Sequence, residues 1–232
     1  MTDAGQPARP AARTRIRSVV ATGRGDDGTT GLLFGGERIR KDDPRTEAYG
    51  TIDEAVAALG LARAHLAVAI GTAAAPGADV DRTTLAEIAD LLLRFQRELF
   101  VAGAELATGR EAWGKLVDGQ TRVSAAMVDG VERALLDLEA RIEMPREFVV
   151  PGETLASASI ELARAILRRA ERRAVSLDAA GQVAGTHLVR YLNRLADLLW
   201  VLARAAEQAE ARTATPSRAD RATRTRRPST SE

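Results

Sequence analysis

Apolar residues recur every three or four positions along five segments of this chain, and no segment alternates apolar and polar residues over more than a few positions. This spacing is the period of an amphipathic α-helix, so it predicts helices over about 44–70 and 82–107. Three more helices are expected to begin near Ser124, Thr154 and Gly185, where a capping hydroxyl or a glycine precedes the apolar repeat.

Helices with one apolar face must bury that face against one another. We therefore expect an all-α fold, an antiparallel five-helix bundle, formed by a single domain over residues 16–208. The stretches 109–120 and 144–153 are predicted to be loops. The tails 1–15 and 209–232 lack apolar periodicity and are predicted to be disordered.

Composition excludes several classes of site. The chain has no cysteine and two histidines, which excludes disulfides, thiolate metal sites and thiol nucleophiles. Aromatic residues make up 3% of the chain, too few for a base-stacking surface, so we expect no nucleic-acid partner although 209–232 carries six arginines. We see no apolar run of about 18 residues and no signal-peptide core, so we expect a cytoplasmic protein with no membrane partner.

Residues 23–45 hold six of the 19 glycines of the chain, together with aspartate, threonine and arginine. The segment lacks the spacing of a P-loop, and no alternating strands and helices surround it as in a dinucleotide fold. Backbone amides and threonine hydroxyls of such a loop suit a polyphosphate, and Asp26 and Asp27 suit a magnesium ion bound with phosphate. A turn without any ligand is the alternative interpretation.

Two predicted helices each carry a stripe of polar residues opposite their apolar face. The first stripe consists of Glu161, Arg164, Arg168, Glu171 and Arg172. The second consists of Arg190, Asn193, Arg194, Asp197 and Arg204. Solvated faces with ion pairs between successive turns are the ordinary interpretation. The preponderance of arginine favours recognition of phosphate or carboxylate instead.

Six blocks of the sequence, in this order, resemble the PduO-type ATP:corrinoid adenosyltransferases. The blocks are TGRGDDGTT at 22–30, KDDPR at 41–45, YGTIDE at 49–54, FVVPG at 148–152, RRAERR at 168–173 and YLNRLAD at 191–197. Together they span about 20–206. The resemblance implies a homotrimer of five-helix bundles with three active sites between subunits.

The resemblance also implies transfer of the 5′-deoxyadenosyl group of ATP to the cobalt of cob(I)alamin, which releases triphosphate and forms adenosylcobalamin. Cob(I) is itself a strong nucleophile, so the protein has to position the substrates and stabilise charge. ATP, Mg2+ and cobalamin are the implied ligands. A reductase and an adenosylcobalamin-dependent acceptor enzyme are the implied partners.

Site residues follow from the matching positions. The triphosphate would be held by Thr22, Gly23, Arg24, Gly25, Asp26, Gly28, Thr29 and Thr30, helped by Lys41 and Arg45. The catalytic set would be Arg168, Glu171, Asn193, Asp53 and Arg164. Arg168, Glu171 and Asn193 would contact ATP or its magnesium, with Glu171 as the candidate protein ligand. Asp53 and Arg164 would form an ion pair between the two substrate sites, and Phe148 would cover the lower axial face of the corrin.

Two positions depart from the family pattern. Gly23 stands where a basic residue is usual, and Glu153 replaces the second glycine of the usual Pro-Gly-Gly. Two alternatives remain open from the sequence. One is a nucleotide-binding regulatory helical bundle without corrin chemistry, and the other is a helical scaffold with nucleic-acid-binding tails.

Overall fold

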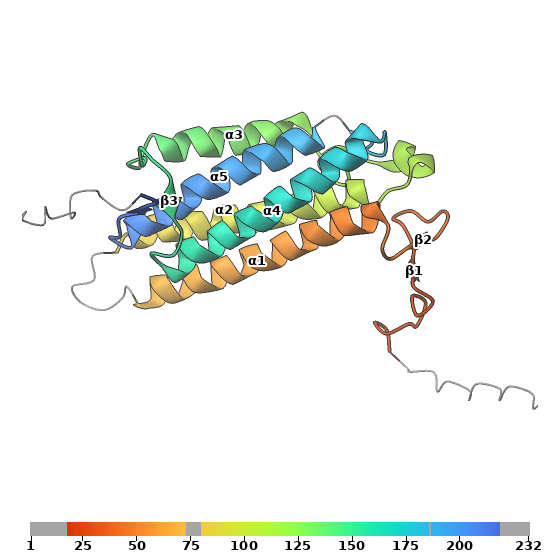
Figure 1. Ribbon diagram of the computed structural model, residues 1–232, viewed down its shortest axis with the longest axis horizontal. Coiled ribbons are helices and arrows are strands. Elements are labelled where there is room, and N and C mark those ends of the chain that lie inside the picture. Colours follow the sequence, from red (N-terminus) through yellow and green to blue (C-terminus); the bar gives the residue numbers. More distant parts are fainter. Residues whose placement is uncertain (1–17, 73–79, 186, 219–232) are drawn as a thin grey trace, which may run out of the picture.

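The computed structural model describes residues 18–72, 80–185 and 187–218, and its fold is mostly helical (Figure 1). The predicted tail 1–15 and the part of the C-terminal tail at 219–232 lie outside the described residues. The helices are α1 (Pro44–Thr72), α2 (Arg82–Leu106), the 3-10 helix η1 (Arg110–Lys115), α3 (Ala125–Glu139), α4 (Leu155–Ala179) and α5 (Leu188–Ala209). The prediction of a mostly helical chain is confirmed.

Helix α5 lies at the centre of the bundle and packs against α2, α3 and α4, while α1 packs against α2 and α4. Leucines recur on several sides of α5, so most of the surface of this helix has to be buried. Leu192, Leu195 and Leu199 are fully buried. The five helices thus share one continuous apolar core.

Each α-helix runs opposite to the one before it along the chain (Figure 1). Helices α3 and α5 therefore run in the same direction, and they are packed neighbours. Glu132 of α3 pairs with Arg190 of α5, and Glu143 beyond α3 donates its N–H to Gln208 near the end of α5. The antiparallel prediction thus holds for consecutive helices but not for this pair.

The starts of α3 and α4 agree with the predicted caps Ser124 and Thr154, whereas α5 begins after His187, which makes no side-chain cap bond. The hydroxyl of Ser124 accepts from the N–H of Met127, and Thr154 and Ser157 form a reciprocal capping box. At α2, the Asp81 carboxylate accepts from the N–H groups of Thr83 and Thr84. These contacts satisfy backbone donors that have no partner inside the helix.

Two short ladders stand at opposite ends of the bundle. At one end β1 (Thr29–Thr30) pairs with β2 (Ile39–Arg40) in the glycine-rich loop. At the other end β3 (Val149–Val150) pairs with β4 (Thr215–Pro216). Prediction placed 209–218 in a disordered tail and 109–120 in a loop. The structure instead pairs Thr215–Pro216 as a strand and places η1 within the predicted loop.

Helix α1 is, among the described helices, the one long and apolar enough to cross a membrane by length and composition. The sequence expectation found no such run. The difference arises because the expectation concerned an uninterrupted apolar run, whereas Arg63 and His65 interrupt the apolar residues of α1. In the fold, one face of α1 packs against α2 and α4.

Candidate active site

The glycine-rich segment 22–43 projects beyond the end of the bundle where α1 begins (Figure 1). Tight turns shape it, with hydrogen bonds from Asp26 N to Gly23 O (3.3 Å) and from Gly28 N to Gly25 O (3.2 Å). Gly23 and Gly28 have φ values of 70° and 80°, which residues with a Cβ rarely adopt. The loop is therefore ordered by its own backbone.

Side-chain hydrogen bonds within this loop connect its first half to its second half and stabilise the turns. The Asp27 carboxylate accepts from the hydroxyl and the N–H of Thr29, and these bonds lower the pKa of Asp27. The Arg38 guanidinium donates to Thr29 Oγ1 (2.8 Å) and to the carbonyl of Arg24 (2.8 Å). The predicted set omitted Arg38, because no sequence motif distinguishes it from the other arginines of this loop.

Lys41 lies against Gly25. A Cβ at Gly25 would stand 2.9 Å from Lys41 Nζ and 3.2 Å from the carbonyl oxygen of Thr29, so a side chain here would displace the end of Lys41 and crowd this carbonyl. The structure thus brings Lys41 together with the predicted phosphate loop. The exposed ammonium beside backbone turns is a suitable site for an anion.

Arg45 was predicted to help to bind the triphosphate, but its side chain is buried. It is 7% exposed, and its guanidinium donates to the carbonyls of Leu106 (2.7 Å), Thr108 (3.0 Å) and Gln182 (2.9 Å). Burial lowers its pKa. Arg45 therefore ties the ends of α2 and α4 to the start of α1 instead of reaching for phosphate.

A groove of about 460 Å³ runs over α5 between α3 and α4. It is lined by Leu135, Glu139, Arg164, Arg168, Arg194, Ala196, Asp197, Trp200 and Val201. Arg168 is exposed and Arg164 is half-buried. The groove therefore combines apolar walls with guanidinium groups, as a large anionic ligand with an apolar body would require.

Two predicted site residues from different helices meet beside this groove. Asn193 Nδ2 of α5 donates to Glu171 Oε1 of α4 at 3.0 Å. Arg194 Nη1 donates in turn to Asn193 Oδ1 at 3.0 Å. This chain of hydrogen bonds fixes the amide of Asn193 and engages one oxygen of Glu171.

Asp53 and Arg164 do not pair within the chain. Asp53 is exposed on α1, and the ion-pair partner of Arg164 among the described residues is Glu161, with Nε and Oε2 2.6 Å apart. Glu161 and Arg204 were both expected in solvated stripes. In the structure they are buried, with 4% and 1% of their surface exposed. Their opposite charges lie 3.4 Å apart and compensate each other inside the core.

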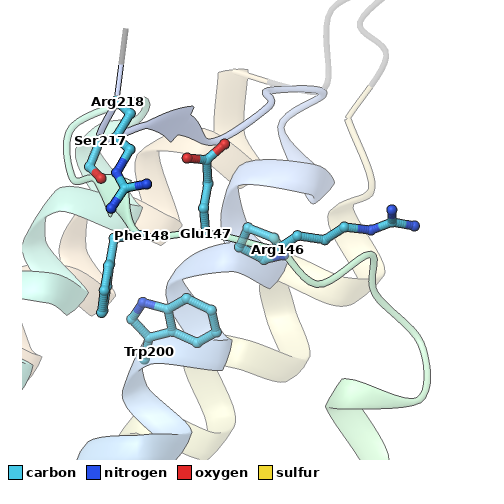
Figure 2. A pocket seen from close by; sticks show the side chains of 7 residues that line it. Arg146, Glu147, Phe148, Trp200, Ser217 and Arg218 are labelled. Atoms are coloured by element: carbon cyan, nitrogen blue, oxygen red, sulfur yellow. The ribbon is translucent and has the colours of Figure 1, made fainter. Parts of the chain in front are cut away.

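Phe148 stands in the connection before β3 and is 86% exposed. It lines a pocket of about 450 Å³ together with Trp200 and the C-terminal residues Ser217 and Arg218 (Figure 2). The Ser217 N–H donates to the Phe148 carbonyl at 2.7 Å, and Thr215 donates to the carboxylate of Glu153. Glu153, which replaces the second glycine of the family's Pro-Gly-Gly, thus helps to hold β4 next to Phe148.

Trp200 lines both the groove and the Phe148 pocket, so the two hollows meet at its indole. Prediction omitted Trp200, because at its position in the apolar repeat of α5 it resembles an ordinary core residue. Its partial exposure comes from the gap between α3 and α4.

The loop 22–30, which contains β1, and the Phe148 pocket beside β3 lie at opposite ends of the helical bundle (Figure 1). Helix α1, which runs from one end to the other, has 29 residues and is about 43 Å long at 1.5 Å per residue. The structure therefore does not bring the predicted phosphate loop and the Phe148 pocket together within one subunit.

Comparison with known proteins decides the family. Residues 20–206 match the family model described as cobalamin adenosyltransferase. The chain belongs to the cobalamin adenosyltransferase family. It is 36% identical over 188 residues to a corrinoid adenosyltransferase of Citrobacter freundii, covering 81% of this chain and 94% of that protein. It is 39% identical over 186 residues to corrinoid adenosyltransferase PduO of Salmonella typhimurium, covering 80% of this chain and 49% of that protein.

Solved structures of this adenosyltransferase fold agree with the chain trace. A variant of the PduO-type ATP:corrinoid adenosyltransferase from Lactobacillus reuteri, complexed with cobalamin and ATP, superposes with a TM-score of 0.69 at 24% identity. The match covers 85% of this chain and 98% of the Lactobacillus chain. The likeness establishes the fold of this family member. Membership of the family accounts for the order of all six sequence blocks.

Proposed function

We propose that this family member transfers the 5′-deoxyadenosyl group of ATP to the cobalt of cob(I)alamin. The observation that carries the proposal is the meeting of two hollows at Trp200, one lined by arginines and one by the exposed Phe148. A corrin is a broad apolar ring with polar edges, and such a surface suits it. The relatives named corrinoid adenosyltransferases support the same conclusion.

We infer that the active enzyme is a homotrimer, in which the loop of one copy faces the groove of another. The outward stripe of α1 supports this assembly, because it consists of Asp53, Ala57, Leu61, Ala64 and Val68 and is mostly apolar. Leu155 and Leu162 on α4 are also exposed, at 68% and 52%. Apolar side chains along two neighbouring helices are typical of a surface that another subunit covers.

Asp53 lies on this outward stripe, and both terminal nitrogens of Arg164 lack a hydrogen-bond partner among the described residues. An ion pair between Asp53 of one copy and Arg164 of the next is therefore part of the proposal. It would separate the ATP site from the corrin site, because the two residues come from opposite sides of the interface.

The residues present fit a magnesium ion that ATP holds mainly by its phosphates. No group of three or more potential metal ligands occurs in the described part of the chain, so the protein itself offers no complete cage. One carboxylate oxygen of Glu171 accepts from Asn193, and the other is available to a metal ion. A magnesium ion bound to phosphates needs one or two protein carboxylates, so Glu171 would be sufficient. Bound there, Mg2+ would neutralise phosphate charge.

The proposed chemistry requires little from the protein beyond positioning. A Co–C bond forms as the cob(I) electron pair attacks C5′ of ATP, while the C5′–O bond breaks and its electron pair leaves with the triphosphate. Lys41 and the loop amides bind the triphosphate, and Arg168 stabilises the charge that develops on it. Phe148 keeps a lower axial ligand off the corrin, which eases the preceding reduction of cob(II).

Cytoplasmic location, a reductase that supplies the electron, and an enzyme that accepts adenosylcobalamin belong to this proposal as well. A nucleotide-binding regulatory bundle is the alternative, and the phosphate loop alone would serve it. The exposed Phe148 beside Trp200 favours the enzyme, because a purely nucleotide-binding protein has no use for an aromatic pocket at the other end of the bundle.

The test is an anaerobic reaction of the protein with ATP, magnesium and chemically reduced cob(I)alamin, followed by the visible spectrum. We expect the light-sensitive spectrum of adenosylcobalamin to form only when ATP is present. Persistence of cob(I) beside a folded, ATP-binding protein would favour the regulatory alternative.

A further inference from the structure

Four charged side chains form a connected row that starts at Arg164 in the wall of the groove. Arg164 Nε donates to Glu161 Oε2 at 2.6 Å, and Glu161 Oε1 lies 3.4 Å from Arg204 Nη1. Arg204 Nη2 donates to Glu207 Oε1 at 2.7 Å. The row runs from the groove wall on α4 into the interior of α5.

Burial increases along this row. Arg164 is 27% exposed by its side chain, whereas Glu161 is 4%, Arg204 is 1% and Glu207 is 1% exposed. Two arginines and two glutamates compensate each other in charge. A buried charge without its partner is costly, so each member constrains the position of the next.

Glu161 is the branch point of the row. One carboxylate oxygen holds Arg164, which lines the groove. The other oxygen faces Arg204, whose guanidinium lies 5.6 Å from the centroid of the Trp200 ring. A single buried carboxylate therefore connects the guanidinium on the groove wall to the indole on its floor.

We propose that Glu161 is a positioning residue for the corrinoid, acting through Arg164. This inference rests on the proposed function of the groove. Because Glu161 takes the Nε of Arg164, the guanidinium is held at Nε, and its two terminal nitrogens, which have no partner among the described residues, are available to the ligand or to the neighbouring subunit. The positive charge of Arg204, 3.4 Å from the other oxygen of Glu161, favours the same place for this carboxylate, so Arg164 does not have to be ordered by the substrate when it binds.

The Glu161→Gln substitution tests this proposal. The neutral amide forms no ion pair with either arginine, since its oxygen can accept from one of them while its NH2 group faces the other. We expect the KM for cob(I)alamin to rise about tenfold, since hydrogen bonds to charged groups have this order of effect. The KM for ATP should stay within about twofold, because Glu161 contacts no residue of the predicted phosphate loop.

The matched control is Glu105→Gln, which also neutralises a buried carboxylate. Glu105 is 1% exposed and accepts from the N–H groups of Val123 and Gly185, at the other end of the bundle from Phe148. Both variants are expected to lose stability, measured by thermal unfolding, but the control should keep the wild-type KM for cob(I)alamin. An equal rise of the KM for cob(I)alamin in both variants would show that Glu161 acts only on stability and would overturn the proposal.

A double-mutant cycle with Arg164→Met separates positioning from stability. If Glu161 acts through Arg164, Glu161→Gln should raise the KM for cob(I)alamin no further in the Arg164→Met background. Additive effects in the cycle, or a wild-type KM in Glu161→Gln alone, would contradict the inference while the wild-type enzyme remains active. Absence of adenosylcobalamin formation by the wild type would instead contradict the proposed function itself.

Discussion

At the scale of single residues, exposure separates groups that meet ligands from groups that hold the fold. Arg45 and Arg168 are both arginines in family-like blocks, yet one is buried under three carbonyls and the other is open to the groove. The sequence does not distinguish them, because each follows an ordinary helical pattern. Only the tertiary structure shows that backbone carbonyls engage three of the five guanidinium N–H groups of Arg45 and that the side chain is buried.

Arg168→Ala is expected to lower kcat by a factor of about 100 or more, because it removes a cation from the place where the leaving triphosphate gains charge. The fold should survive, since the side chain is exposed on α4. Steady-state kinetics and circular dichroism measure the two effects. Arg133→Ala on α3, another exposed arginine, is the control. Wild-type turnover in Arg168→Ala would remove Arg168 from the catalytic set.

Phe148→Ala is expected to slow the reaction that starts from cob(II)alamin with a reductant more than the reaction that starts from preformed cob(I)alamin. The ring is 86% exposed, so its loss should cost the free protein little stability. The two assays, run side by side, give the comparison. Equal losses in both would exclude an axial role for Phe148.

At the scale of elements, α3 and α4 begin where the sequence places a capping side chain, whereas α5 begins without one. Ser124 and Thr154 were predicted from their position alone, because N-cap bonds join residues two or three positions apart. The ladder between β3 and β4 was not predicted, because it joins segments 66 positions apart and each strand has two residues. No periodicity is visible in so short a strand.

Asp81→Ala is expected to lower the free energy of unfolding by about 1 kcal/mol at neutral pH. The hydroxyl of Thr84, then backbone N–H groups, lower the pKa of Asp81 below its ordinary value of 3.8. A lowered pKa in the folded state means that the contribution is complete above 3.8 and is lost as the pH falls through the folded value. The deficit of the variant should therefore shrink in acid.

Chemical denaturation at neutral and acidic pH measures this deficit. Asp90→Ala, at an exposed position in the interior of the same helix, is the control and should not be destabilised at either pH. A deficit of the Asp81 variant that persists unchanged in acid would show that the cap does not depend on the ionised carboxylate.

At the scale of the whole molecule, the arrangement of the two predicted substrate regions decides what one subunit can do. The phosphate loop and the Phe148 pocket lie at opposite ends of α1, and the outward stripe of α1 is mostly apolar. In the proposed trimer, a second copy covers this stripe and completes the site. Oligomeric state and activity should therefore be lost together.

Leu61→Asp is expected to reduce the mass in solution from three times the 24.7 kDa chain mass to a single chain, and to abolish turnover. The charge falls in the middle of the outward stripe of α1, where burial at an interface would be costly. Light scattering after size exclusion measures the mass. Val117→Asp is the control, because Val117 is 48% exposed compared with 46% for Leu61 but lies in a turn outside α1. A trimer that persists in Leu61→Asp would contradict the proposed interface.

The sequence by itself determined the helices, their caps and the family, because these depend on spacings along the chain and on blocks of adjacent residues. Only the tertiary structure decided which arginines are free and which are buried, that α3 and α5 run side by side in one direction, and that Trp200 joins two hollows. Glu161 and Arg204 show the reason. Their helical positions place them among charged residues, and their burial follows from contact between α4 and α5, which no single helix encodes.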